Sequence, residues 1–315
     1  MSNRETPYLR SKPAPNLGKM PRMPAASRPT VDVIVPFAGP PEALANLALR
    51  LERLGRARGD TLTIVDNRPA DAPAAAGALP YVLRAPERQS SYFARNRGAA
   101  TTRGEWLMFL DADVEPPPDL ISRYFREPVG DRVGVLAGGV QDEPLDPGSR
   151  GSVAARYAML KAAMSQANTM RGEWAYAQTA NCAVRRQAFE QVGGFRDDVR
   201  SGGDADLCWR LRAADWKIEL RESALAIHRN RPTLRALLRQ RARHGSGAAW
   251  LRREHSGPFP PQRPLGLVKW TVESFVRAAH ARSKGRHDDA LVAFVEPLSV
   301  WAFELGRLLP NEVDR

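Results

Sequence analysis

The chain has 315 residues, 43% of them hydrophobic, which is enough for one large domain or two modest ones with a sizeable core. Lys and Arg number 47 against 35 Asp and Glu, giving a formal charge of +12. That charge favours acidic partners such as nucleotide phosphates, nucleic acid or anionic lipid, although a solvated arginine-rich surface is the simpler explanation. The two cysteines stand in no close-spaced motif, so neither a zinc site nor a disulfide framework is indicated.

The compartment is predicted from what the sequence lacks. The N-terminal region has no apolar core of a signal peptide, and a reducing cytoplasm is the simplest setting for Cys182 and Cys208. Residues 290–309 have the length of a membrane span, but Glu296, Pro297, Glu304 and Arg307 interrupt them, which argues against spanning. We expect a cytoplasmic protein, with this stretch either packed on the core or lying at the inner face of the membrane.

The predicted elements begin after a tail at residues 1–29 that is rich in Pro, Arg, Lys and Ser and is expected to be disordered. Strands are predicted at 31–37, 61–67, 81–85 and 105–110, and helices at 41–54 and 90–104, the second capped by Ser90 and stopped by Gly104. This order predicts a parallel α/β sheet, in which ligands bind beyond the carboxyl ends of the strands.

Three of these strands end in residues other than aliphatic ones, namely Pro36-Phe37, Asp66-Asn67 and Asp111-Ala112-Asp113. If the strands are parallel neighbours, their ends share one edge of the sheet. Asp111 and Asp113 would point the same way in extended backbone, which suits a metal site. The alternative is a polar turn before Pro116 that has no chemical role.

The second half of the chain continues the alternation. A short helical segment is predicted after Pro118, a strand at 132–141, helical or irregular structure at 142–176, a strand and then a helix stopped by Gly193-Gly194 at 177–195, and a Gly-rich turn, a helix and a strand at 201–220. From about residue 230 the chain is rich in arginine and mostly helical.

Five segments of the chain match one known family, in its order and at roughly its spacing. They are VDVIVPF (31–37), TIVDN (63–67), ARNRGAATTRGEWLMFLDADVEPPPDLI (94–121), NCAVRRQAFEQVGGF (181–195) and GGDADLCWRL (202–211). Together they resemble the family 2 glycosyltransferases of the GT-A fold. The resemblance implies a catalytic domain at 30–230, with a mostly parallel nucleotide-binding sheet flanked by helices, and a helical C-terminal extension at 231–315. It also implies inverting transfer, of hexosyltransferase type, from a nucleoside diphosphate sugar with Mn²⁺ or Mg²⁺.

The resemblance assigns roles on the donor side. It makes Asp113 the metal ligand and Asp111 the contact on the nucleoside side. Asp66 contacts the base, and Pro36 and Phe37 line the same pocket. Phe37 either stacks on the base or is a core aromatic residue.

Further donor-side roles are less specific. Arg95 and Asn96 precede the metal-site strand, where such residues in similar proteins face the nucleotide or order the loop, and Arg97 competes for a phosphate contact. His228 follows a strand and either completes the metal's coordination or is a polar residue at a strand end.

The expected base is Asp204, because inverting transfer needs a proton acceptor within reach of the acceptor hydroxyl. The family usually places a glutamate before this aspartate, where Gly203 stands here, so support of the base by a neighbouring carboxylate is in question. Asp206 begins the following helix and is interpreted as structural or acceptor-orienting.

The segment QRARHG (240–245) partly matches the Gln-x-x-Arg-Trp motif of processive members of the family. Gln240 and Arg243 agree with it, but His244 replaces the tryptophan, which argues against a processive synthase. Arg243 either neutralises diphosphate or lies on a solvated face. The resemblance favours UDP as the nucleotide and leaves the acceptor open among glycan, lipid-linked, peptide and small-molecule compounds.

Two rival functions are weighed against this hypothesis. A nucleotidyltransferase would carry a basic Gly-rich loop after its first strand, but residues 36–42 read PFAGPPE. A nucleic-acid-binding protein would need basic residues clustered on one element, for which the Arg-rich residues 229–253 are the best candidate. We do not expect a nucleic-acid partner, because that reading leaves the paired aspartates and Asp204 without a purpose.

Overall fold

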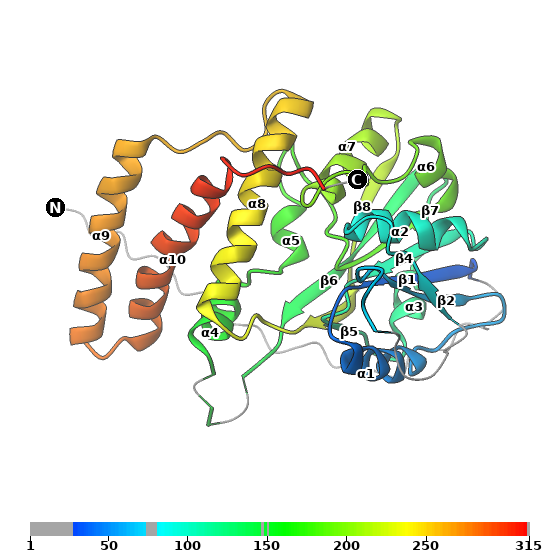
Figure 1. The fold of residues 1–315 in the computed structure, drawn as a ribbon, viewed down its shortest axis with the longest axis horizontal. Helices are drawn as coiled ribbons and strands as arrows, with labels where there is room; N and C mark the ends of the chain where they lie inside the picture. The colour runs from blue at the N-terminus through cyan, green and yellow to red at the C-terminus, as the bar shows by residue number, and fades with distance from the viewer. Residues whose placement is uncertain (1–27, 74–80, 146–147, 150, 314–315) are drawn as a thin grey trace.

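The computed structural model describes residues 28–73, 81–145, 148–149 and 151–313, so residues 1–27 of the predicted tail lie outside it. One eight-stranded sheet is built from strands that lie between residues 31 and 228, with helices on both faces (Figure 1). Its strands lie in the order β3 (Val82–Arg84), β2 (Thr61–Asp66), β1 (Val31–Phe37), β4 (Trp106–Leu110), β7 (Asn181–Arg185), β6 (Val133–Asp142), β8 (Lys217–His228) and β5 (Val114–Glu115).

The first half of the sheet is parallel, as predicted. Strand β1 pairs in parallel with β2 and β4, and β2 pairs in parallel with β3, so their carboxyl ends meet at one edge. The second half is mixed, because β7 is antiparallel to β4 and β6, and β5 is antiparallel to β8. Strands β6 and β8 pair in parallel, so the sheet as a whole is mixed and mostly parallel, as the predicted fold class requires. Hydrophobic periodicity identifies a buried strand but does not specify its direction.

Alternating side chains give the sheet two apolar faces that both need cover. Val33 and Val35 belong to one hydrophobic cluster, while Ile34 and Phe109 belong to the other. The first cluster includes residues of α1 (Pro41–Glu52) and α3 (Leu120–Tyr124), and the second includes residues of α2 (Ser91–Ala100), α6 (Arg186–Gln191) and α7 (Gly203–Ala213). Helices α2 and α7 thus lie on the same face of the sheet, where each can present residues at its edge.

Only one of the two predicted ends of α2 is confirmed. Ser90 caps the helix as predicted, since its side chain accepts a hydrogen bond from the Phe93 N–H. The helix ends at Ala100 rather than at Gly104, so that predicted stop was wrong. The Thr101 hydroxyl donates to the carbonyl of Gly98 (2.9 Å), and such local bonds compete with continued helix. The predicted stop of α6 is confirmed, because Gly193 and Gly194 both have positive φ.

The C-terminal extension is helical, as predicted, and lies beside the sheet (Figure 1). It consists of α8 (Leu234–His255), α9 (Pro264–Ser283) and α10 (His287–Gly306), next to α4 (Val153–Lys161) and α5 (Gln166–Thr169). Helices α8 and α10 cross so closely that a Cβ at Gly306 would lie 2.0 Å from the carbonyl oxygen of Ala242. The chain then returns to the loop before α7, where the Asn311 side chain donates to the carbonyl of Ser201 (3.0 Å).

Within the described residues, no helix combines the length and apolarity needed to cross a bilayer. Helix α10, which includes most of residues 290–309, carries Pro297 in its interior. Helix α9 exposes several large apolar side chains, among them Leu265 and Val276. Contact of this extension with a membrane surface stays a prediction.

Candidate active site

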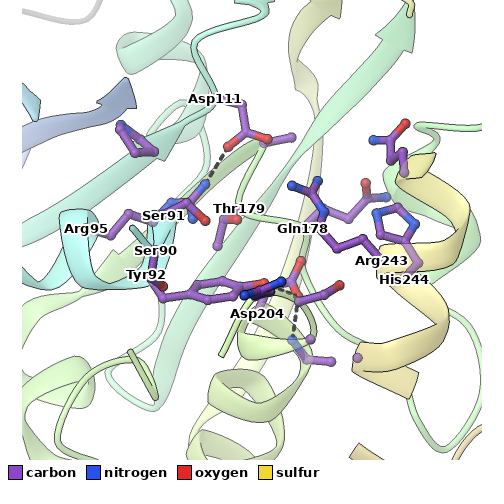
Figure 2. Close-up of a pocket in the computed structure, with 18 of the residues that line it drawn as sticks. Ser90, Ser91, Tyr92, Arg95, Asp111, Gln178, Thr179, Asp204, Arg243 and His244 are labelled. Carbon is purple, nitrogen blue, oxygen red and sulfur yellow. Dashed lines mark hydrogen bonds and ion pairs between the residues drawn. The ribbon is translucent and has the colours of Figure 1, made fainter. Parts of the chain in front are cut away.

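A cavity of about 1200 Å³ lies at the carboxyl edge of the parallel strands. Its walls come from the ends of β1, β4 and β8, from the first turns of α2 and α7, and from α8. The volume is slightly above the ~300–1000 Å³ of common small-molecule pockets. Figure 2 shows side chains of α2, α7 and α8, together with Asp111 after β4, around a shared space.

Asp111 and Asp113 both line the cavity but have different partners. The nearly fully buried Arg95 of α2 forms an ion pair with Asp111 (Figure 2). Asp113 instead lies 3.1 Å from Nη2 of Arg231 and 3.6 Å from Nε2 of His228. Strand pairing explains this second contact, because β5 and β8 place Val114 opposite His228.

These charges shift the pKa values of Asp113 and His228 in opposite directions. Burial alone would raise the pKa of Asp113, but the hydrogen bond from His228 and the charges of His228 and Arg231 outweigh it and lower that pKa. Burial alone would lower the pKa of His228, but the hydrogen bond and charge of Asp113, joined by the charges of Asp111 and Asp142, raise it. The contact between the two side chains therefore favours the ionised carboxylate of Asp113.

Asp113 and His228 fit a divalent cation. Their oxygen and nitrogen donors, 3.6 Å apart, can reach one ion through bonds of about 2.0–2.2 Å. Oδ1 of Asp142 lies 4.0 Å from Nδ1 of His228, and neither atom has a hydrogen-bond partner in the described part of the chain. A carboxylate in this position orients a ligating imidazole. The described residues contain no cluster of three His, Cys, Asp or Glu that could hold a metal, so further ligands would come from phosphate or water.

Asp204 lies in the first turn of α7 and lines the same cavity (Figure 2). Its Oδ1 accepts hydrogen bonds from the Ala205 N–H (3.0 Å) and the Tyr92 hydroxyl (3.4 Å). Burial raises the pKa of Asp204 above its ordinary value. A raised carboxyl pKa improves the match between this group and proton transfer near neutral pH.

Tyr92 explains why a glycine precedes Asp204. A Cβ at Gly203 would lie 2.9 Å from the Tyr92 ring, so a glutamate at this position would collide with it. The guanidinium of Arg95 lies 5.6 Å from the same ring. Tyr92 thus occupies the space beside Gly203, and its hydroxyl contacts the predicted base where the family usually has a carboxylate nearby.

Asp66 and Phe37 are both buried where their strands end. Asp66 is 3% exposed and forms ion pairs with Arg68 (2.8 Å) and Arg84 (2.9 Å), and its neighbour Asn67 forms the cavity wall. Burial would raise the pKa of Asp66, but the hydrogen bonds and charge of Arg68, together with the charge of Arg84, lower it. Phe37 belongs to the core and also lines the cavity. The predicted contact of Asp66 with a base stays a prediction.

Pro36 lines the cavity as expected, whereas Asn96 and Arg97 do not belong to its described lining. The Asn96 amide donates to the carbonyl of Phe195 (2.9 Å) and accepts from its N–H (3.0 Å). Of the two predicted roles, this geometry supports ordering of the loop. Arg97 lies on the exposed side of α2, where it pairs with Glu87.

Asp206 is not directed into the cavity. Its buried carboxylate pairs with Arg210 (2.7 Å) and contacts Nε2 of His255 (3.0 Å). This matches the structural half of its interpretation, since both oxygens are engaged within the protein.

Sequence reasoning missed several lining residues, including Tyr92, Gln178, Arg231 and Arg241. Arg231 follows His228 by three residues, but only the fold reveals its contact with Asp113. For Arg241 a signal was available, because it lies inside the QRARHG segment that had already been singled out. The other members of that segment, Gln240, Arg243 and His244, also line the cavity.

Comparison with known proteins decides the family. Residues 106–285, more than half of the chain, match the model of glycosyl transferase family group 2. The chain belongs to this family. Membership favours the expected reaction class over a nucleotidyltransferase or a nucleic-acid-binding protein.

Two named glycosyltransferases are similar in sequence to this chain. The chain is 28% identical over 274 residues to the pre-mycofactocin glycosyltransferase of Mycobacterium tuberculosis, covering 81% of this chain and 55% of that protein. It is also 28% identical over 202 residues to glycosyltransferase AglE of Haloferax volcanii, covering 62% of each. The chain therefore spans little more than half the length of these relatives.

A solved structure shows the same fold. The mannosyltransferase PcManGT of Pyrobaculum calidifontis, determined in complex with GDP-Man and Mn²⁺, superposes with a TM-score of 0.61 over 89% of this chain and 88% of that one. The identity is 15%, so the likeness concerns the fold alone. The predicted GT-A fold is thereby confirmed.

Proposed function

We propose that the protein is a metal-dependent inverting glycosyltransferase, which moves a hexosyl group from a nucleoside diphosphate sugar, UDP being the expected nucleotide, to a hydroxyl acceptor. One observation carries the proposal: Asp113, His228 and Asp204 come from three separate elements and line one cavity at the carboxyl edge of a sheet. Membership of a glycosyltransferase family supports the reaction class.

The donor side of the proposed site is built around the strand ends. Pro36 and Phe37 border the nucleoside, and Asp111, held by Arg95, contacts it. Asp113 and His228 hold Mn²⁺ or Mg²⁺. When bound, the cation neutralises charge on the diphosphate leaving group. Arg231, beside Asp113, adds a fixed positive charge where negative charge develops.

Asp204 acts as the general base of the proposed reaction. Its carboxylate takes the proton of the acceptor hydroxyl while that oxygen attacks the anomeric carbon from the face opposite the diphosphate. A new carbon–oxygen bond forms, the bond to the diphosphate breaks with its electron pair, and the configuration is inverted. Tyr92 restrains the carboxylate through its hydroxyl, and burial keeps its pKa high enough to receive the proton.

The test is a thermal-shift panel of UDP, GDP, dTDP and CDP, each with Mn²⁺ and with EDTA, on the wild type and Asp113→Ala. We expect one nucleotide to raise the melting temperature, only with metal and only in the wild type. That result also identifies the nucleotide. The proposal fails if none of the four nucleotides raises the melting temperature of the wild type, whether Mn²⁺ or EDTA is present.

A further inference from the structure

The cavity carries more positive than negative side chains. Among the described residues, its lining includes five arginines, Arg95, Arg200, Arg231, Arg241 and Arg243, against three aspartates, Asp111, Asp113 and Asp204. In the proposed function, a divalent cation and a donor with one negative charge on each phosphate offset each other. The surplus of arginine is therefore not consumed by the donor.

Two arginines of α8 account for the surplus. Arg95 and Arg231 are paired with Asp111 and Asp113, respectively. In the part of the chain that the structure describes, the guanidinium groups of Arg241 and Arg243 form neither an ion pair nor a hydrogen bond. Unpaired positive charge inside a concave, partly desolvated site attracts an anionic ligand.

Arg241 is held in place without an acidic partner. Its guanidinium lies 5.1 Å from the centroid of the Phe303 ring on α10, a distance that allows a cation–π contact, and its buried Nε has no hydrogen-bond partner in the described structure. Glu296 contributes a negative charge nearby but is itself bound by Lys161 (2.8 Å). Such a restrained guanidinium is suited to bidentate binding of a phosphate or carboxylate.

The neighbouring His244 lies in the same positively charged surroundings. Burial, together with the charges of Arg243, Arg241 and Arg231, lowers the pKa of His244 to about 3. The imidazole is therefore neutral at ordinary pH and can donate one hydrogen bond to an anion without adding charge. It also replaces the tryptophan that would stack on a glycan in the family motif.

We propose that Arg241, Arg243 and His244 form an anion-binding subsite for the acceptor, so that the acceptor carries a phosphate or carboxylate near its reacting hydroxyl. Figure 2 shows Arg243 and His244 on α8 across from Arg95 on α2, with Asp204 between them. An acceptor anchored on α8 through its anion would present its hydroxyl to Asp204. This inference rests on the proposed function and adds the class of acceptor to it.

The main competing assignment gives these arginines to the donor diphosphate. Two observations favour the acceptor. The diphosphate is expected at Asp113, where Arg231 already lies 3.1 Å from the carboxylate. Arg241 lies instead against Phe303, on the side of the cavity formed by α8 and α10. The experiment must nevertheless separate the two anions.

Calorimetric titration of the full chain with methyl phosphate and with acetate provides the test, first without nucleotide and then with saturating UDP and Mn²⁺. The variants are Arg241→Gln, Arg243→Gln and, as a matched control, Arg253→Gln, an exposed arginine of α8 that does not line the cavity. We expect at least one probe to bind in both states, about tenfold more weakly to each cavity variant and unchanged to the control. UDP affinity should change less than about twofold.

Three results would overturn the subsite: neither probe binds, the variants bind them like the wild type, or UDP displaces them. Displacement would assign the arginines to the donor. Comparison of methyl phosphate with acetate identifies the preferred anion. Arg243 is exposed, so Arg243→Gln decides the matter even if Arg241→Gln fails to fold. If UDP itself does not bind, the nucleotide assignment fails, whereas the titration of the nucleotide-free protein still judges the subsite.

Discussion

Two sides of the cavity differ in whether their charged side chains are paired. One side, the strand-end wall, is formed where the strands end, and the other, the α8 wall, is formed by Gln240–His244 of α8. At the strand ends, Asp66, Asp111 and Asp113 all have arginine partners. On α8, Arg241 and Arg243 have no acidic partner among the described residues. Paired charges hold a fixed geometry before any ligand arrives, whereas unpaired ones are available to it. The comparison suggests a preorganised donor wall and an acceptor wall that is completed by its ligand.

The largest effect is expected from Asp204→Asn, since Asp204 lies between the two walls. The amide cannot accept the hydroxyl proton, so we expect sugar transfer to fall about 10²–10⁴-fold while donor affinity stays within about twofold. Nucleoside diphosphate release with a mixed panel of anionic and neutral hydroxyl compounds measures transfer, and calorimetry measures binding. Transfer at the wild-type rate would mean that another group is the base.

Asp113→Ala tests the donor wall directly. We expect metal-dependent nucleotide affinity to fall by about 100-fold or more, with no difference between variant and wild type in EDTA. Asp142→Asn is the companion change, because it removes a carboxylate 4.0 Å behind His228, and a loss of about 10–100-fold in metal affinity is expected. If the wild type, Asp113→Ala and Asp142→Asn depend equally on metal, the metal does not bind at Asp113 and His228.

Tyr92→Phe should have a smaller effect, which appears in the pH profile. The Tyr92 hydroxyl donates to the Asp204 carboxylate and so favours its charged form. Its loss should raise the pKa of Asp204 further, moving the acidic limb of kcat/KM to higher pH. At pH values below the shifted pKa of Asp204, kcat/KM should fall by roughly tenfold or less, and at higher pH it should return to the wild-type value. Tyr176→Phe is the control, since Tyr176 lines the cavity without a hydrogen bond to Asp204 in the structure described. If the acidic limb of the pH profile stays in place in Tyr92→Phe, the Tyr92 hydroxyl does not affect the pKa of Asp204 and the residue serves only in packing.

The smallest effect on chemistry is expected from Gly306→Ala, which addresses the support of the α8 wall. Its Cβ would lie 2.0 Å from the Ala242 carbonyl oxygen, so α8 and α10 must move apart, at a stability loss of about 1–3 kcal/mol. Gly266→Ala on α9 is the matched control, because its Cβ meets no described heavy atom within 4 Å and alanine favours helix by about 1 kcal/mol. Urea denaturation compares the two. Equal stability would contradict the close crossing.

The sequence predicted the donor wall better than the α8 wall, for a physical reason. Strand ends are recognisable locally, since an apolar run that stops at acids, as at Asp66 and Asp111, is visible within a few residues. The two-residue strand β5 and the contact between Asp113 and His228 depend on a pairing between residues 114 and 228, which no local pattern encodes. Gly203 likewise appeared as a missing acid, because the ring that fills its place belongs to Tyr92, far away in sequence.

The return of the chain after α10 has a consequence for engineering. Asn311 donates to the carbonyl of Ser201 and accepts, through its backbone carbonyl, from the N–H of Arg200. The short peptide at residues 307–311 therefore ties α10 to the loop that leads into Asp204. A displacement of the helical extension is therefore transmitted to Asp204, the proposed base, through covalent chain and two hydrogen bonds. Substitution of Asn311 would tune the position of Asp204 from outside the cavity while leaving its charged side chains intact.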